Sequence, residues 1–392
     1  KDSEIQKEKL ERGSISYHSF HLDKDYRRFD FYQFVMAEDC IVTIENFKNL
    51  KYQTFPSEPL MNKQGFWTAL NYPSVYDGFF QAPSGINKTV TVAVIDSGID
   101  LDHKDLAGAI WTNSGEVQGN GIDDDGNGYI DDIHGYHFER GIGDPDPDDQ
   151  FSAYNIHGTA VAGLIGAVEN QSGIVGVMPS YVKLMSLNVF GEQGGSDVAD
   201  VAEAIDYAVS NGAKIINMSL AGQSQSTVIQ TALLNAVTKG VFIVVAAGND
   251  GVDLGESTFY SPIGYAKDID GVIGVGATIA DTKQRAPYSN YNPTFVEIAA
   301  PGSLSLTGKL VGIFTLDVDD GYGYYDGTSF AAPLVAGAAA LAYAYLDSHG
   351  KSPTPAGLED LIKKSSDPIQ ALDGYIQQCR SLNFSNLYEN LQ

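Results

Sequence analysis

The chain has 392 residues, of which 43% are hydrophobic, and a formal net charge of −26. Its length allows one large or two medium domains, and its apolar content is ample for a core. Because phosphate binding needs Lys and Arg, 50 acidic residues against 24 basic ones argue against a nucleic-acid partner. The acidic excess instead permits metal binding and fits a soluble protein in a salty or extracellular setting.

Cysteine content and hydropathy exclude two further classes. The two cysteines, Cys40 and Cys379, form neither a disulfide scaffold nor a zinc motif, and they allow either one long-range bridge or two separate thiols. The longest apolar run, 330–346, is too short for a bilayer span and contains Pro333 and Gly337. We therefore expect a buried central helix and no transmembrane segment.

The first 55 residues are polar, aromatic and irregular in pattern, and they contain no catalytic motif. Residues 1–13 (KDSEIQKEKLERG) are typical of a solvated helix or a frayed terminus. Residues 39–47 (DCIVTIENF) indicate a strand.

From about residue 88 the pattern alternates between apolar strands and amphipathic helices. The predicted strands are 88–96 (KTVTVAVID), 213–221 (AKIINMSLA), 240–250 (GVFIVVAAGND) and 271–279 (GVIGVGATI). The predicted helices are 158–168 (GTAVAGLIGAV), 197–212 (DVADVAEAIDYAVSNG) and 227–240 (TVIQTALLNAVTKG). This alternation predicts an α/β fold with a mainly parallel sheet, in which ligands bind beyond the carboxyl ends of the strands.

Polar residues of four kinds stand at such positions. Asp96 and Asn249 follow predicted strands, His157 precedes a helix, and Ser329 opens the helical stretch 326–338 (DGTSFAAPLVAGA). Taken singly, each has a structural explanation as a loop starter, a cap or a core histidine. Taken together, they supply the hydroxyl, base, orienting acid and side-chain amide of a serine protease, in the order Asp, His, Ser.

These segments also resemble a known family, the subtilases. VAVIDSGID around Asp96, HGTAVAG around His157, AAGND around Asn249 and GTSFAAP around Ser329 are similar to its four catalytic motifs. NMSLAG resembles its substrate-binding strand, and AAPG at 299–302 resembles the loop that precedes its serine motif. The resemblance covers roughly residues 56–350 and implies a three-layer subtilisin-like fold, with residues 351–392 as a helical extension.

The resemblance implies a serine endopeptidase acting on protein or peptide substrates. Ser329 would attack the scissile carbonyl, His157 would carry the proton, and Asp96 would hold the imidazole tautomer. Asn249 and the backbone N–H of Ser329 would stabilise the oxyanion. The residues expected to pair with the substrate backbone are Ser219, Leu220 and Ala221.

Three positions depart from the family pattern. Ile156 stands where Gly or Asp is usual, Ala160 where a second histidine is usual, and Phe330 where Met follows the nucleophile. None of the three removes a catalytic group, so we expect effects on pocket shape or on the level of activity.

An acidic segment, 119–132 (GNGIDDDGNGYIDD), has the spacing of an EF-hand-like calcium loop. The matching oxygen donors are Asp123, Asp125, Asn127, the Tyr129 carbonyl and Asp131. His134 stands in place of the final glutamate, so no EF-hand helix pair is implied. The alternative is a solvated acidic loop, and we favour calcium because closely spaced aspartates repel one another.

The resemblance implies a second Ca²⁺ site in 167–179 (AVENQSGIVGVMP), which is similar to a calcium loop of subtilases. The expected ligands are the side chains of Asp105 and Asn170 and the carbonyls of Val168, Ser172 and Ile174. Glu58 is a weaker candidate, and a plain surface loop is the alternative. An ion at 143–150 (GDPDPDDQ) is not expected.

Residues 1–55 are expected to be a prodomain remnant, a family-specific extension or a partner-binding arm, and a remnant could act as the enzyme's own inhibitor. Because the chain begins at Lys1 and not at Met, we expect that a leader was removed or never included. We expect a monomer that is secreted or held in the cell envelope.

Rival functions are a catalytically silent binding protein on the same scaffold, an α/β-hydrolase esterase and a nucleotide-binding protein. The esterase requires G-x-S-x-G and the order Ser, Asp, His, which this chain lacks. Nucleotide binding is weaker still, because GVGATI lacks the full glycine fingerprint.

Overall fold

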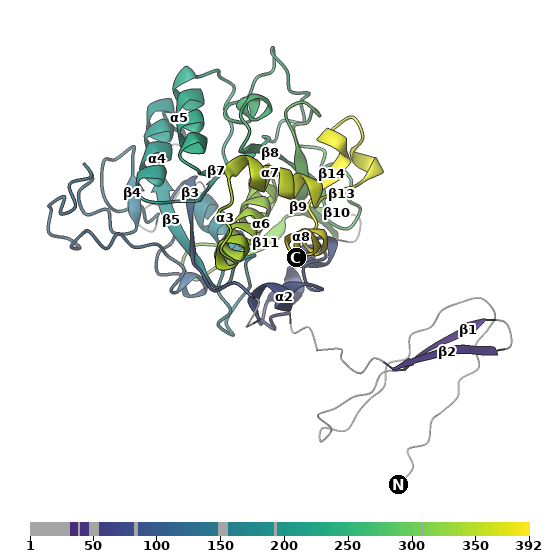
Figure 1. Cartoon of the computed structure of the whole chain (residues 1–392). Coiled ribbons are helices and arrows are strands. Elements are labelled where there is room, and N and C mark those ends of the chain that lie inside the picture. Colours follow the sequence, from purple (N-terminus) through teal and green to yellow (C-terminus); the bar gives the residue numbers. More distant parts are fainter. Residues whose placement is uncertain are drawn as a thin grey trace, which may run out of the picture. The chain divides into compact units, whose positions relative to one another are not determined.

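The computed structural model describes residues 32–37, 40–46, 55–81, 85–147, 156–191, 194–306 and 309–392. The chain divides into two units, residues 1–52 and 53–392 (Figure 1). In the first unit, strands β1 (Tyr32–Ala37) and β2 (Cys40–Asn46) form an antiparallel hairpin, which confirms the strand predicted at 39–47. The helix or frayed end predicted for 1–13 lies outside the described residues.

A ten-stranded sheet organises the second unit. Its order is β13-β14-β9-β8-β7-β6-β3-β5-β4, with β10 paired to β9. All neighbours from β4 to β14 are parallel, whereas β13 and β10 pair antiparallel. The strands are β3 (Val90–Asp96), β4 (Gly135–His137), β5 (Val182–Asn188), β6 (Ile215–Met218), β7 (Phe242–Ala246), β8 (Val272–Ile279), β9 (Ile298–Leu306), β10 (Lys309–Val311), β13 (Asp367–Pro368) and β14 (Arg380–Ser381). A separate hairpin is formed by β11 (Ile313–Leu316) and β12 (Tyr322–Tyr325).

Helices lie between and around these strands (Figure 1). The α-helices are α1 (Phe66–Ala69), α2 (Tyr76–Phe80), α3 (Ile156–Gly166), α4 (Val198–Ser210), α5 (Thr227–Thr238), α6 (Thr328–Ser348), α7 (Pro355–Lys364) and α8 (Phe384–Leu391). The short 3-10 helices are Met61–Lys63, Lys104–Leu106, Ile263–Asp268, Gln370–Leu372 and Gln377–Cys379. The predicted helices at 158–168, 197–212 and 227–240 are thereby confirmed as α3, α4 and α5.

Strand β3 shows why the fold has three layers. Val92 and Val94 belong to the apolar core shared with α3 and α6, whereas Ala93 and Ile95 belong to the core shared with α4 and α5. Successive side chains of a strand point to opposite faces, so a strand covered on both faces is apolar throughout. Each fully buried aliphatic side chain of this kind contributes about 1.5–3 kcal/mol. The predicted three-layer α/β fold with a mainly parallel sheet is confirmed.

Helix α6 is the central helix predicted from the longest apolar run. It is the one helix among the described residues that is long and apolar enough to cross a membrane, but 89% of its most apolar window is buried inside the protein. A core helix passes the same test, and its burial here is that of a core helix.

Residues beyond 350 belong to the same compact unit as the sheet. Strand β14 extends the sheet through the pair Ser381 and Ala299, and the buried side chains of α7 and α8 share the core of α6. Cys379 in this region carries a free thiol, while the side chain of Cys40 lies outside the described residues.

Candidate active site

The first element of the site is a carboxylate held against an imidazole. Asp96, the last residue of β3, is completely buried, and its Oδ1 lies 2.7 Å from Nδ1 of His157. The backbone N–H of Ser97 donates to the same oxygen at 2.8 Å. A buried carboxylate in this position holds the Nδ1 proton of the neutral imidazole, which leaves Nε2 free to accept a proton.

Close backbone approach fixes this pair. His157 is the second residue of α3, and Gly158 follows it with its N–H donating to Ser97 Oγ at 3.0 Å. A Cβ at Gly158 would lie 2.0 Å from the carbonyl oxygen of Gly98, so a side chain at Gly158 would push α3 away from the end of β3. Glycine is therefore required for the contact between Asp96 and His157.

The surroundings of His157 favour its protonated form more than water favours that of a free imidazole. Burial by itself lowers the pKa of His157, but the negative charge of Asp96 and the hydrogen bond to it outweigh burial, and the pKa is raised from 6.5. The His157 side chain remains 31% exposed, so it is reachable from the solvent side.

Ser329 stands at the start of α6, next to Asn249. The Oδ1 atom of Asn249 accepts hydrogen bonds from the N–H and the hydroxyl of Thr328 at 2.8 and 2.9 Å. The Asn249 amide N–H groups therefore stay available, since no described residue accepts from them. Gly327 makes the approach possible, because its φ is 150° and a Cβ there would lie 3.1 Å from Asn249 Nδ2.

Pro333 explains how Ser219 is joined to this helix start. A proline has no N–H, so the carbonyl four residues earlier in a helix loses its usual partner. That carbonyl belongs to Ser329, and it accepts the Ser219 hydroxyl at 2.8 Å instead. The Ser329 hydroxyl in turn donates to the Ser219 carbonyl at 3.1 Å.

This exchange leaves the Ser329 hydroxyl directed at Ser219 and not at His157. Among the described residues, the carbonyl of Ser219 is the one partner of Ser329 Oγ. The imidazole is nevertheless close, because its ring centroid lies 5.5 Å from that of Phe330, the next residue along α6. The hydrogen bond between a nucleophile and its base often becomes short and well aligned only when substrate binds, and a rotation about the Cα–Cβ bond of Ser329 would redirect its hydroxyl.

A cavity of about 110 Å³ adjoins these groups. Ser219, Leu220 and Ala221, the residues predicted to bind substrate, form one side of it. Its remaining lining residues are Ala246, Gly248, Asn249, Asp250, Tyr260, Thr328 and Ser329. A serine hydroxyl and a free amide donor at the edge of one cavity could act on a single bound carbonyl.

The loop 167–179 wraps a buried carboxylate, as the family resemblance implies. Asp105 Oδ2 accepts from the N–H of Ile174 at 2.9 Å, and Oδ1 accepts from the amide of Asn170 at 3.2 Å. Glu58 reaches the same loop through the Gln171 N–H, at 3.0 Å. The other oxygen of Glu58, Oε2, is buried and has no hydrogen-bond partner among the described residues. Such an oxygen is costly to bury unless a cation or donor meets it.

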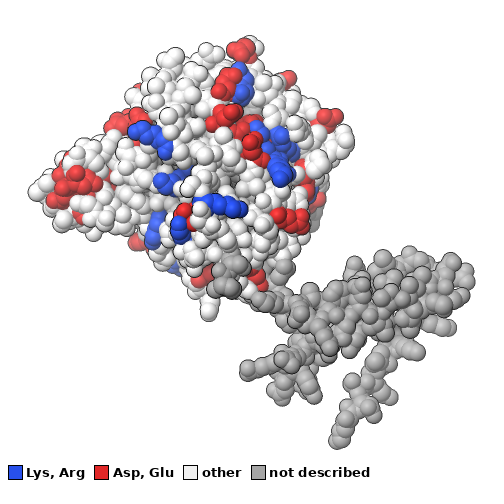
Figure 2. All heavy atoms as spheres, viewed as in Figure 1, with Lys and Arg blue, Asp and Glu red and all other residues white. Residues whose placement is uncertain are grey.

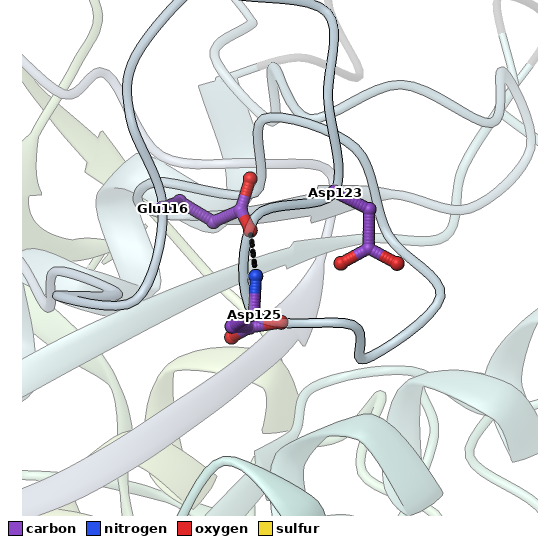
Figure 3. A group of neighbouring side chains, drawn as sticks. All are labelled: Glu116, Asp123 and Asp125. Carbon is purple, nitrogen blue, oxygen red and sulfur yellow. Dashed lines mark hydrogen bonds between the residues drawn. The ribbon is translucent and has the colours of Figure 1, made fainter.

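The acidic loop gathers a set of carboxylates that differs in part from the predicted one. Figure 3 shows Glu116, Asp123 and Asp125 as neighbours, with the backbone N–H of Asp125 bonded to the Glu116 carboxylate, and one carboxylate oxygen of each residue lies within 4.8 Å of the other two. Asp131 is not part of this group, and its carboxylate accepts from the N–H groups of Asn120 and Gly121 at 3.1 and 2.9 Å. Figure 2 shows acidic side chains gathered where the second unit projects at the left of the view.

Glu116 is a residue that the sequence analysis missed. It is 8% exposed and accepts the backbone N–H groups of Asp124, Asp125 and Asp131. The Asn127 side-chain oxygen accepts from the backbone N–H of Tyr129, and the hydroxyl of Tyr129 donates to the Glu203 carboxylate on α4. An acid seven residues before Asp123 was the available signal, but it lies outside the spacing of a calcium loop.

The fold has three α/β layers, and one edge of its sheet carries an Asp–His pair, a serine at a helix start and an asparagine amide. This arrangement is that of the serine hydrolases. The comparisons narrow the class: a profile of the subtilase family matches residues 87–384. The chain belongs to the subtilase family.

Individual relatives agree with this assignment. The thermophilic serine proteinase of Bacillus sp. strain AK1 is 33% identical over 290 residues, which cover 74% of this chain and 59% of that protein. Subtilisin E of Bacillus subtilis strain 168 is 35% identical over 252 residues, which cover 64% of this chain and 55% of that protein. The chain thus spans little more than half the length of these curated relatives.

Two solved structures are similar in fold. A cold-adapted subtilisin-like serine proteinase has a TM-score of 0.57 at 28% identity, covering 77% of this chain and 92% of that one. A protease of Pseudoalteromonas arctica PAMC 21717 has a TM-score of 0.65 at 28% identity, covering 86% of this chain and 100% of that one.

Proposed function

We propose that this chain is a serine endopeptidase that hydrolyses peptide bonds of protein or peptide substrates. The observation that carries the proposal is the 2.7 Å contact between Asp96 and His157, at the sheet edge where Ser329 and Asn249 also lie. Family membership and the serine proteases among the relatives support it.

The proposed mechanism assigns one role to each group. His157 Nε2 takes the proton of Ser329 Oγ as the oxygen attacks the carbonyl carbon, and the imidazolium then gives that proton to the leaving amine. Asp96 keeps the Nδ1 proton in place and stabilises the imidazolium. The Asn249 amide and the Ser329 N–H donate to the oxyanion, where they bind the charge that develops in the transition state. Water then releases the acyl group from Ser329 by the same steps.

A fluorophosphonate probe tests the proposal, because it reacts only with an activated serine. We expect it to label Ser329 slowly in acid and faster as pH rises through a pKa above 6.5, since His157 acts as a base only when neutral. Mass-spectrometric measurement of the labelling rate from pH 5 to 9 gives this profile. His157→Ala is the control and should remove labelling at every pH.

The rival function, a silent binding protein on the same scaffold, rests on the Ser329 hydroxyl donating to Ser219 in place of His157. That protein would leave Ser329 unlabelled across the whole pH range, so the same experiment separates the two.

We propose further that the protein binds Ca²⁺ in two loops. Glu58, Asp105, Asn170 and the carbonyls of Val168, Ser172 and Ile174 would hold one ion, and the unpartnered buried oxygen of Glu58 supports this. Glu116, Asp123 and Asp125 would contribute to the other site, for which Asn127, the Tyr129 carbonyl and Asp131 remain predicted ligands. The hard carboxylate and carbonyl oxygens suit Ca²⁺, which would cross-link these loops.

Chelation is expected to destabilise the protein. At a free Ca²⁺ concentration of about 1,000 times Kd, binding to one site adds about 4 kcal/mol to the free energy of unfolding. Urea unfolding with and without chelator, in a Ser329→Ala background that prevents self-digestion, measures the loss. Glu58→Gln and Asp123→Asn should each reduce the loss of unfolding free energy that the chelator causes. An unfolding curve that does not change with chelator would contradict both sites.

We also propose a domain division and a location for the chain. We infer a catalytic domain over 56–350 with residues 351–392 as its extension, and an N-terminal segment, 1–55, that is a prodomain remnant or a family-specific extension. We infer a secreted or envelope location from the acidic composition, although one relative is the major intracellular serine protease of Bacillus subtilis strain 168, 35% identical over 258 residues.

A further inference from the structure

Tyr260 separates two cavities beside the proposed active site. The smaller, about 110 Å³, reaches Ser329 and Asn249, and the larger, about 340 Å³, is lined by residues 223–225, 252 and 256–260. Within the described part of the chain, Tyr260 is the one residue that lines both. Its ring borders the smaller cavity, because a Cβ built at Gly248, another lining residue, would lie 3.4 Å from a Tyr260 ring carbon.

Hydrogen bonds hold this wall in place. The Tyr260 hydroxyl donates to Asp250 Oδ2 at 2.7 Å, and the Gln223 side-chain amide donates to the Tyr260 hydroxyl. The neighbouring backbone is fixed as well, because Ser261 and Gly222 exchange two hydrogen bonds of 2.9 and 2.8 Å. Tyr260 is only 4% exposed, so its ring cannot turn aside without losing these contacts.

The cavity volume limits what the smaller site can hold. A cavity of about 150 Å³ accommodates one benzene ring. The 110 Å³ beside Ser329 is smaller than that, and part of it borders Asn249 and Ser329 themselves. We infer that a substrate carbonyl at Ser329 and Asn249 would place the side chain of its own residue, P1, in this cavity, because both groups line it.

We propose that Tyr260 restricts the P1 residue to small side chains and excludes aromatic ones, an inference that rests on the proposed endopeptidase activity. The substrate class is thus peptides with residues such as alanine at P1. Removing the ring would join the two cavities and admit an aromatic P1 side chain.

The test compares two peptide substrates that differ only in P1, alanine or phenylalanine, on the full chain. Fluorophosphonate titration first gives the concentration of reactive serine, so each kcat/KM refers to active enzyme. The wild type should prefer alanine at least about tenfold, the lower end of what one pocket change supplies. Tyr260→Ala should raise the phenylalanine-to-alanine ratio at least tenfold. Tyr260→Phe keeps the ring without its hydroxyl and should keep the wild-type ratio.

Each outcome decides a different claim. A titratable wild type that prefers phenylalanine, or a Tyr260→Ala variant with an unchanged ratio, overturns the role of Tyr260 and leaves the endopeptidase proposal standing. A wild type with no titratable serine and no hydrolysis of either peptide overturns the endopeptidase proposal and this inference together. If Tyr260→Ala does not fold, Tyr260→Leu takes its place, because it also removes the aromatic ring, and it should raise the same ratio.

Discussion

Ser329→Ala is expected to abolish peptide hydrolysis while leaving the fold intact. The hydroxyl oxygen is the atom that would bond to the substrate carbonyl carbon. The nearby hydroxyl of Ser219 is not free to replace it, because it is bound to the Ser329 carbonyl. In subtilisin, a relative, loss of the nucleophile lowers kcat by about 2 × 10⁶, and we expect a loss of that order here. Steady-state hydrolysis of a chromogenic peptide measures it.

Ser352→Ala provides the matched control, because Ser352 is an exposed serine in the loop before α7. It should retain wild-type activity. Circular dichroism and urea unfolding should show both variants folded, since the hydroxyl of Ser329 contributes one hydrogen bond, worth about 0.5–1.5 kcal/mol. Hydrolysis that survives in Ser329→Ala would show that the activity belongs to another group.

The sequence predicts the alternation of strands and helices wherever the strands are runs of β-branched apolar residues. Strand β5 was missed for a physical reason. Its sequence, VKLMSLN, contains Leu and Met, which are good helix formers, and Lys183 and Ser186 interrupt the apolar run. Pairing with β3 over the register Val90 to Val182 makes it a strand, and such a tertiary contact leaves no local signal.

The residues of the candidate site could be predicted from the sequence, but the hydrogen bonds between them could not. Asp96 and Asn249 could be placed together because parallel strands end at one edge of the sheet. The direction of the Ser329 hydroxyl could not be predicted, because it depends on Ser219, 110 residues earlier in the chain. Glu116 was missed because its neighbours converge only after the acidic loop folds back on itself.

Lys363→Met is expected to cause the largest loss of stability. Lys363 lies on α7 between Glu297 and Glu359, with its Nζ 2.8 and 2.6 Å from their carboxylate oxygens. The two glutamates are 4% and 5% exposed. Removing the ammonium group in direct contact leaves two buried carboxylates close together, with only the more distant charge of Arg380 still acting on both. Breaking a buried ion pair in this way costs about 3–5 kcal/mol. Urea unfolding at pH 8 measures the change in the free energy of unfolding.

The loss should depend on pH in a direction set by Glu297. Burial, and then repulsion from Glu359, raise the pKa of Glu297 from 4.5 to about 7. A raised carboxyl pKa favours folding fully below 4.5, and that contribution is lost as pH rises through about 7. Without Lys363, which lowers this pKa, the deficit relative to wild type should shrink as pH falls from 8 to 5, because protonation removes the repulsion. Lys364→Met, at the exposed neighbour, should stay within about 0.5 kcal/mol of wild type. Equal stability of the two variants, or a deficit that persists in acid, would show that Lys363 does not neutralise this pair.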